Sequence, residues 1–253
     1  MSERAAGGVQ SVERAFELLE LITNAGGSLT LSELASASTL PMPTIHRLLR
    51  TLGRGGYVRQ FANRRYALGP RLIRLGEGAS RQLGSAGRVA LAGLVDHLGE
   101  TANMAVLDGA MVLYVAQAPS THSMRMFTEV GRRVHPHDSG VGKAILADLD
   151  EEVVRSVVAR AGMPTPTPNS IGDVASLLTE LATIRARGYA IDDGEQEIGV
   201  RCIAVTVPDA PTPTAISVSG PAARVDAAFT QQAVPALHAA ALEISRSFAP
   251  PSE

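Results

Sequence analysis

Arginine side chains, which bind phosphate and carboxylate groups, gather in one stretch of this chain, residues 40–76. The stretch holds eight arginines and no Asp or Glu, although the whole chain has a formal charge of −2. Residues 1–80 carry ten Arg against six Glu, whereas the remainder carries 13 basic and 19 acidic residues. A basic N-terminal part on an acidic body indicates a polyanionic partner for that part alone. Charge by itself leaves an ordinary solvated surface as an equal alternative.

Patterns around these arginines predict three helices followed by a β-hairpin. Apolar residues recur at helical spacing over residues 11–22. Thr30 and Glu33 have the spacing of a capping box, and Pro43 suits the first turn of a third helix. Two short β segments then flank a turn at residues 62–63. This order is that of a winged helix-turn-helix, whose second motif helix enters the major groove of DNA.

The apolar positions of the third helix decide which of its side chains are available to DNA. Ile45, Leu48, Leu49 and Leu52 fall on one face, which we expect to be buried. The hairpin tip would carry arginines to the DNA backbone or minor groove. The predicted DNA-binding residues are therefore Thr44, His46, Arg47 and Arg50 on the helix, with Arg64 and Arg65 on the hairpin.

The chain beyond the hairpin mixes helices and strands. A helical connector follows the hairpin, and its glycines at 84–87 are expected to break it into two pieces. Asp108-Gly109 predicts a hairpin turn, and a later helix has a Ser170/Asp173 cap and ends at Gly188. The predicted fold class is α+β, with an N-terminal winged helix-turn-helix, a helical linker and a C-terminal GAF-like effector-binding domain. The expected boundaries are 1–69, 70–85 and 86–253.

Several classes of protein are disfavoured by the composition and motifs. A single cysteine, Cys202, excludes an internal disulfide or a Cys-rich zinc site and suits a reducing compartment. No apolar run approaches the roughly 18–20 residues of a membrane span, and the N-terminus lacks a signal-peptide core, so we expect a cytoplasmic protein without a membrane partner. Nucleotide, dinucleotide and G-x-S-x-G motifs are missing from the sequence, so neither a cofactor nor an enzyme is expected.

Other residues could in principle perform chemistry. A hydrolase using Cys202 or Ser217 with His137 or His238 is one alternative, and a DNA-binding adaptor without a ligand is another. His135, His137 and Asp138 have metal-binding side chains but no well-spaced further ligand, so we predict a loop near a pocket and no metal. The one lysine, Lys143, is expected to cap or pack its helix.

Motifs along almost the whole chain resemble those of the IclR family of bacterial transcriptional regulators. They are "SVERAFELLELI", "LSELASASTLPMPTIHRLLRTLGRGGYV", "YALGPRLIRLG", "TANMAVLDGAMVLYVAQ", "VHPHDSGVGKAILA", "RARGYAIDDGEQEIGVRCIAVTV" and "AISVSGPAARV". The resemblance covers residues 9–248. It implies a repressor or activator, often of catabolic genes, that binds double-stranded operator DNA as a homodimer or homotetramer. The linker would contribute to dimerisation, and the C-terminal domain would bind a small organic acid or aromatic effector.

The resemblance also implies where the effector lies. Carried over by motif, the effector-binding residues are Met126, Val134, Gly140, Val141, Asp192, Val200, Cys202, Ser217 and Ser219. Backbone N–H groups at the start of the "GKAILA" helix would point at an acid group. Two features depart from the family pattern: Val141 stands where smaller residues are usual, and Ser123 is polar where an apolar wall is expected.

Overall fold

The computed structural model describes residues 9–125 and 129–248, with the backbone alone for residues 79–86. The chain divides into two compact units, Met1–Ala79 and Ser80–Glu253. The boundary falls within helix α4 (Arg71–Leu98), in the segment 70–85 that the sequence predicts as a linker. The division into three parts at the expected boundaries stays a prediction.

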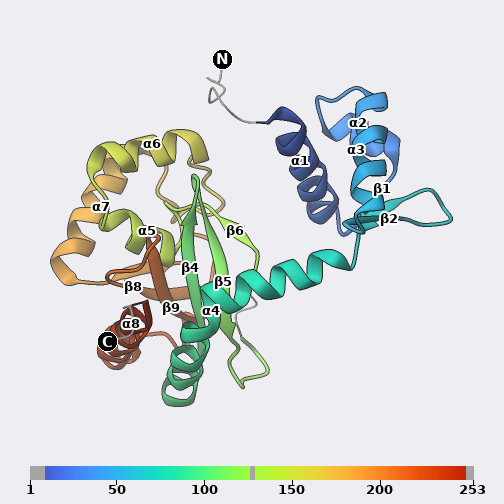
Figure 1. Ribbon diagram of the computed structural model, residues 1–253. Helices are drawn as coiled ribbons and strands as arrows, with labels where there is room; N and C mark the ends of the chain where they lie inside the picture. Colours follow the sequence, from blue (N-terminus) through green and yellow to red (C-terminus); the bar gives the residue numbers. More distant parts are fainter. Residues whose placement is uncertain (1–8, 126–128, 249–253) are drawn as a thin grey trace. The chain divides into compact units, whose positions relative to one another are not determined.

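The first unit is a winged helix, as predicted (Figure 1). Its strands form a three-stranded antiparallel sheet in the order β1-β3-β2. The short first strand of this sheet was not predicted. The elements are α1 (Gln10–Asn24), β1 (Ser28–Leu29), α2 (Leu31–Ala37), α3 (Met42–Arg54), β2 (Val58–Gln60) and β3 (Tyr66–Leu68).

Local hydrogen bonds start the second helix and turn the hairpin. The Thr30 hydroxyl accepts the N–H of Glu33 at 3.2 Å, and the Glu33 carboxylate accepts the N–H of Thr30 at 2.7 Å, so the predicted capping box is confirmed. The hairpin turns over residues 61–64, where the N–H of Arg64 donates to the carbonyl of Phe61 at 2.9 Å. We call β2, β3 and this turn the wing.

The apolar pattern of α1 is divided between core and surface. Leu18, Leu19 and Ile22 are buried against α2 and α3, but Phe16 is 62% exposed and Val12 is 50% exposed. In α3, Ile45 and Leu49 are buried while Leu48 and Leu52 pack against the same core, as expected. The α3 face opposite this core is consequently free to meet a partner.

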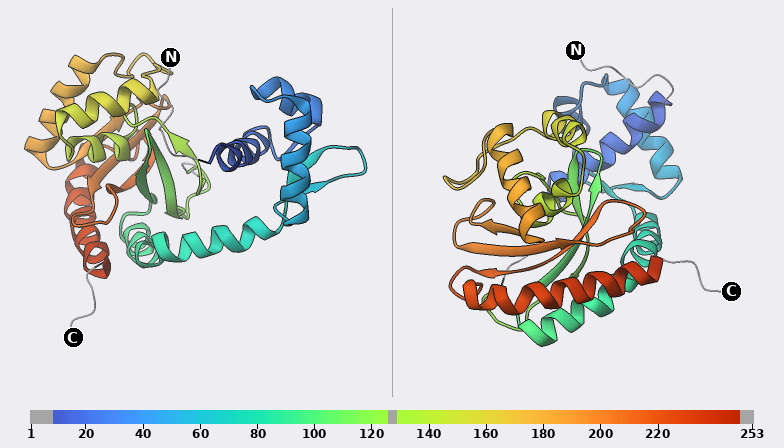
Figure 2. Two further views of the ribbon diagram at one scale, coloured as in Figure 1. Left: turned by 45° about the horizontal axis from the view of Figure 1, so that its top comes forward. Right: turned by 90° about the vertical axis from the view of Figure 1, so that its left-hand side faces the viewer.

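The second unit is an antiparallel sheet of six strands in the order β6-β5-β4-β9-β8-β7. Helices α5, α6 and α7 cover one face, and α8 with the end of α4 covers the other (Figure 2). The elements after α4 are β4 (Thr101–Asp108), β5 (Met111–Ala118), β6 (Arg133–Val134), α5 (Gly140–Ala147), α6 (Glu151–Ala161), α7 (Val174–Arg187), β7 (Ala190–Asp193), β8 (Val200–Thr206), β9 (Thr214–Pro221) and α8 (Ala227–Phe248). The predicted α+β class is confirmed. Among the described helices, none is long and apolar enough to cross a membrane.

One local prediction was wrong, and another was right only in part. Helix α4 runs unbroken over 28 residues, and a Cβ built on Gly87 would lie 2.5 Å from Sδ of Met104 on β4. Glycine at 87 therefore permits close packing of helix on sheet, which compensates for its poor helix propensity. At α7 the N-cap is Asp173, which accepts the N–H of Ser176 at 2.9 Å, whereas Ser170 bonds to the 194–196 loop instead.

Candidate functional sites

The outer surface of α3 carries most of the predicted DNA-binding residues. His46, Arg47 and Arg50 are exposed, and Thr44 is half-buried. Among the described residues, no acid forms an ion pair with Arg47 or Arg50. The guanidinium donors of both arginines are thus available to a polyanion.

A groove of about 180 Å³ lies between α3 and β2, and we call it the α3–β2 groove. His46 and Arg50 line it from the helix, and Arg59 and Gln60 line it from the strand. The guanidinium carbon of Arg59 lies 4.8 Å from the ring centroid of Phe61, a cation–π contact that holds the side chain in place. Sequence reasoning missed Arg59 as a site residue, although it stands in the acid-free arginine run.

The two arginines of the wing tip have different surroundings. Arg64 is exposed at the turn, with a positive φ of 62°. Arg65 instead folds back: its Nη2 donates to the carbonyl of Ser28 at 2.8 Å, its Nε to the Ser28 hydroxyl at 3.1 Å, and it pairs with Glu33 at 3.1 Å. We expected Arg65 to be available to DNA, but most of its donors hold the wing against β1 and α2.

In the second unit, polar side chains gather on the sheet face that α5 covers. Antiparallel pairing places Asp192, Cys202, Ser219 and Thr101 opposite one another across β7, β8, β9 and β4. Ser217 and Asn103 form a second pair two residues along the same strands, so all six side chains share one face. We call Thr101, Asn103, Asp192, Cys202, Ser217 and Ser219 the buried polar patch.

The structure brings together four of the predicted effector residues in this patch and adds two that were missed. Each of the six is at most 5% exposed. Asn103 and Thr101 could have been suspected from their alternation on β4, but only strand pairing shows that they adjoin Ser217 and Ser219. The predicted residues on β7, β8 and β9 therefore form one continuous surface.

Two polar atoms of the buried polar patch lack partners. Asn103 Nδ2 and Ser217 Oγ make no conventional hydrogen bond within the described residues, although the Ser217 hydroxyl interacts with the Cys202 thiol. The carbonyl of the same Asn103 amide accepts from Gln117 at 3.3 Å. Buried polar groups are nearly always paired, so two orphan groups on adjacent strands indicate a place for a missing partner.

Burial sets the protonation of the acidic groups in the buried polar patch. It raises the pKa of Asp192 to about 7, although the N–H groups of Glu195 and Gln196, at 2.8 and 3.4 Å from Oδ1, act in the opposite direction. Burial also raises the pKa of the Cys202 thiol to about 12. A thiol so rarely ionised at neutral pH is unsuited to act as a nucleophile.

The start of α5 lies directly on the buried polar patch. A Cβ built on Gly140 would lie 2.8 Å from Sγ of Cys202, so glycine is needed at this approach. The Ser139 hydroxyl accepts the N–H of Gly142 at 3.3 Å and caps the helix. Val134 and Val141 are buried in the core beneath α5–α7. Met126 lies outside the described residues.

A cavity of about 320 Å³ lies at the start of β8 and the end of β9. The predicted residue Val200 lines it, and Val200 pairs with Pro221, two residues from Cys202 and Ser219 on their strands. Arg125 and Glu197 also line this cavity, and neither was predicted. The cavity thus carries one cation and one anion, and none of the six residues of the buried polar patch lines it.

The segment before α5 holds histidines beside a buried acid. His137 Nε2 contacts the carbonyl of Pro164 at 2.9 Å, and the ring centroids of His135 and His137 are 5.6 Å apart. Burial lowers the pKa of His137 and raises that of Asp138 to about 6. In the described part of the chain, no three His, Cys, Asp or Glu side chains are placed to hold a metal ion.

Lys143 is the largest fully buried side chain of the described residues, and it is only 1% exposed. Its Nζ donates to Glu195 Oε1 and lies 3.6 Å from Glu180 Oε1. The hydroxyls of Thr167 and Ser170 donate to the carbonyl of Glu195 at 3.0 and 2.6 Å. Lys143 was expected to cap or pack its helix; it packs, and it also fixes the loop after Asp192.

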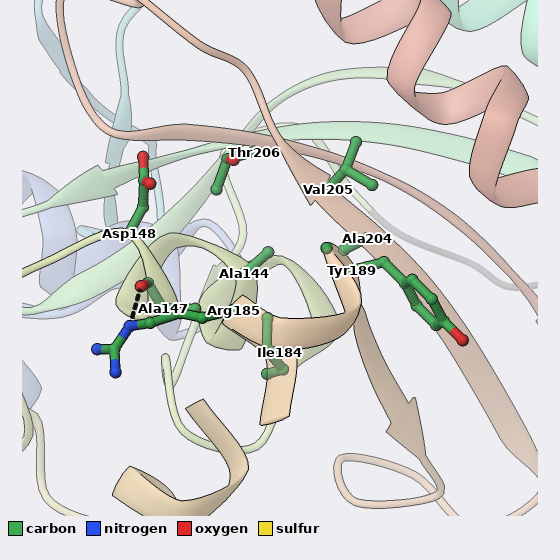
Figure 3. Close-up of a pocket in the computed structure, with 10 residues that line it drawn as sticks. Ala144, Ala147, Asp148, Ile184, Arg185, Tyr189, Ala204, Val205 and Thr206 are labelled. Atoms are coloured by element: carbon green, nitrogen blue, oxygen red, sulfur yellow. Dashed lines mark hydrogen bonds between the residues drawn. The ribbon is translucent and has the colours of Figure 1, made fainter. Parts of the chain in front are cut away.

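A separate cavity of about 210 Å³ lies at the opposite end of α5, between α7 and β8 (Figure 3). None of the predicted site residues lines it. Arg185 points to the end of α5, where its Nε donates to the carbonyl of Ala147 at 2.7 Å. Because this guanidinium satisfies the end of a helix, we assign the cavity no functional role.

A winged helix joined to an α+β unit with a buried polar patch defines a transcription regulator of the kind that combines DNA binding and sensing in one chain. Residues 11–61 match the family model for the IclR helix-turn-helix domain, and residues 79–246 match that for the bacterial transcriptional regulator IclR C-terminal domain. The chain belongs to the IclR family of DNA-binding transcriptional regulators. This membership excludes the alternative of a hydrolase.

Individual relatives agree with this assignment. The transcriptional repressor IclR of Escherichia coli (strain K12) is 39% identical over 228 residues, which is 87% of this chain and 83% of that protein. The HTH-type transcriptional regulator BhcR of Paracoccus denitrificans (strain Pd 1222) is 35% identical and covers 97% of this chain and 89% of its own. The crystal structure of an IclR transcriptional regulator from Alicyclobacillus acidocaldarius superposes with a TM-score of 0.85 at 30% identity, over 94% of this chain and 98% of that one.

Proposed function

We propose that this regulator binds operator DNA through α3 and the wing and that a small organic acid in the second unit changes its affinity for DNA. The effector would occupy the buried polar patch and enter through the cavity beside Val200. The observation that carries this proposal is the pair of buried orphan groups, Asn103 Nδ2 and Ser217 Oγ. A bound oxygen acceptor would satisfy both of them.

The charges around the buried polar patch favour an acid as the effector. Arg125 lines the cavity beside Val200, where Glu197 offsets its charge, and the first N–H groups of α5 at Gly140 and Val141 suit an anion. An ionised Asp192 would repel an anion, but burial raises its pKa to about 7, so a protonated Asp192 is accessible near neutral pH. A protonated Asp192 can donate a hydrogen bond to the bound acid.

We further propose that the chain works as a homodimer or homotetramer and controls a catabolic operon. Dimers suit operators with two half-sites, because one winged helix reads few base pairs. Exposed apolar residues on α1 and on the start of α4, among them Phe16 and Ile73, offer surface for such contacts. A relative from Salmonella typhimurium that is 38% identical is named the acetate operon repressor, so a carbon-utilisation operon is a reasonable target.

Thermal shift against a panel of small aliphatic and aromatic carboxylic acids would test the effector. Any acid that raises the melting temperature is then tested by gel shift on DNA upstream of the gene. We expect Ser217→Ala to weaken binding of that acid by about 0.5–1.5 kcal/mol, the value of one hydrogen bond. The control is Ser156→Ala on α6, which lies outside the buried polar patch and should leave affinity unchanged.

Two results would count against this proposal. Equal affinity in wild type and in a variant with Ser217→Ala and Ser219→Ala together would move the effector away from the buried polar patch. Stabilisation by neutral aromatic compounds alone, with no response to acids, would replace the acid by an aromatic effector. A chain that binds its upstream DNA but responds to no compound would be the ligand-free adaptor.

A further inference from the structure

The α3–β2 groove has arginines on two facing elements and no acid among its lining residues. Arg50 comes from the helix, and Arg59 comes from the strand. In the described part of the chain, neither has an ion-pair partner. The groove is therefore a small concave surface with unneutralised positive charge on both sides.

Helix geometry separates Arg50 from Arg47. His46, Arg50 and Gly53 stand at i, i+4 and i+7, so they share the α3 face that borders the groove. Arg47 follows His46 by one residue, about 100° further round the helix, and it does not line the groove. The two arginines consequently face different parts of any bound DNA.

We propose that the α3–β2 groove binds one phosphate of the DNA backbone between Arg50 and Arg59, while Arg47 remains outside it to contact base edges. Guanidinium groups bind phosphate oxygens through parallel N–H donors, and His46 and Gln60 supply further donors at the groove. The volume of about 180 Å³ is several times the roughly 30 Å³ that a water molecule occupies in the liquid, so a hydrated phosphate group fits.

The surroundings of Arg59 prepare it for this role. Its guanidinium carbon lies 4.8 Å from the ring centroid of Phe61, and an aromatic ring accepts no conventional hydrogen bond, so this contact leaves the N–H donors available to a phosphate. Arg65 differs, because its donors bind Ser28 and Glu33. Arg65 is thus a positioning residue that holds the wing, and Arg59 is a contact residue.

The inference rests on the proposed DNA binding by the winged helix. The experiment therefore measures both the salt dependence of binding and the preference for the upstream duplex. Full-length protein is titrated into a labelled duplex from the DNA upstream of its gene and into a scrambled duplex, over a series of NaCl concentrations. Arg50→Gln and Arg59→Gln should each reduce the slope of log K against log[salt] by about 0.9, the value for one phosphate contact. Both should weaken the two duplexes equally, and Arg59→Lys, which retains the charge, should keep the slope.

Two controls distinguish the loss of a phosphate contact from a change in the position of the wing and from a change in net charge. Arg65→Gln should lower affinity without changing the slope, because no phosphate contact is lost. Arg160→Gln, at an exposed arginine on α6, should change neither the affinity nor the slope.

An unchanged slope in either groove variant, while wild type still prefers its own duplex, would overturn the phosphate site and leave the proposed function intact. A wild type with no preference for its own duplex would overturn the proposed function as well.

Discussion

The two units of this chain use charge in opposite ways. In the winged helix the charges lie on the surface, and Arg47, Arg50 and Arg59 are all exposed. The sensing unit also has exposed charges, but it buries several as well, among them Lys143 at 1% and Asp192 at 4% exposure. Surface charges interact through water and are screened by salt, whereas buried charges experience a low dielectric, which raises the pKa of Asp192.

This difference predicts which condition each unit responds to. DNA binding by exposed arginines should depend on ionic strength, because counterions leave the DNA when phosphates are neutralised. The folding and ligand affinity of the sensing unit should depend on pH, because its buried acids change protonation near neutrality. Stability should therefore be far more sensitive to charge removal in the second unit than in the first.

The largest effect is expected from breaking the buried pair of Lys143 and Glu195. Lys143→Met leaves the Glu195 carboxylate buried without its cation, which should reduce the free energy of unfolding by about 3–5 kcal/mol. Urea unfolding followed by circular dichroism measures the loss, and hydrogen exchange of α5 locates it in the second unit.

An exposed ion pair on α6 provides the matched control. Arg155 and Glu151 are 2.6 Å apart, but their side chains are 55% and 59% exposed. Arg155→Met should change the free energy of unfolding by less than about 0.5 kcal/mol. If Lys143→Met were equally mild, burial would not distinguish the two kinds of charge.

A smaller effect is expected for Asp192, and it should depend on pH. Its folded pKa of about 7 lies above the ordinary value of 3.8, so the native state binds the proton more tightly. This stabilisation is complete below about pH 4 and is lost as the pH rises through about 7. The total loss of unfolding free energy is on the order of 1–3 kcal/mol. Unfolding free energies of wild type should therefore fall across this window more than those of Asp192→Asn.

The Asp192→Asn variant isolates this residue from its neighbours. Its side-chain amide would still offer an oxygen to the N–H of Glu195, so the local loop is kept. Asp138 has a raised pKa and His137 a lowered one, and both act in both proteins; Glu195, whose charge also raises the pKa of Asp192, is coupled to it, so the difference reports on this pair. If the pH profiles of the two proteins ran parallel, Asp192 would already be ionised in the folded protein across this window, and its pKa would not be raised.

Short-range signals in the sequence were sufficient for most of the fold. The capping box of Thr30 and Glu33 and the hairpin after β4 involve residues within a few positions of each other; the capping box is present, and the two-residue turn lies at Gly109-Ala110, one position after the expected Asp108-Gly109. The glycines of α4 were misread because helix propensity is local, whereas the reason for Gly87 is its contact with Met104 on a strand. Local patterns cannot report such packing.

The functional sites were predicted less completely, because their geometry joins distant residues. Arg65 is bound by Ser28, 37 positions away, so its direction could not be read from the arginine run. Lys143 meets Glu195 across 52 positions, and Asn103 adjoins Ser217 only through strand pairing. The residue types at these sites were visible in the sequence, but their partners depend on the tertiary fold.

The smallest effect on stability is expected for Arg47, and its effect on recognition should be specific. Arg47→Ala removes an exposed side chain outside the α3–β2 groove, so the free energy of unfolding should change by at most about 0.5 kcal/mol. If Arg47 contacts a base edge, the preference for operator over scrambled DNA should fall by about 1–3 kcal/mol, while the affinity for scrambled DNA changes little. Competition binding with both duplexes at one salt concentration measures this, with Arg50→Gln as the variant that weakens both. Equal losses on both duplexes after Arg47→Ala would make Arg47 another phosphate contact, and sequence reading would then have to come from elsewhere on α3 or the wing.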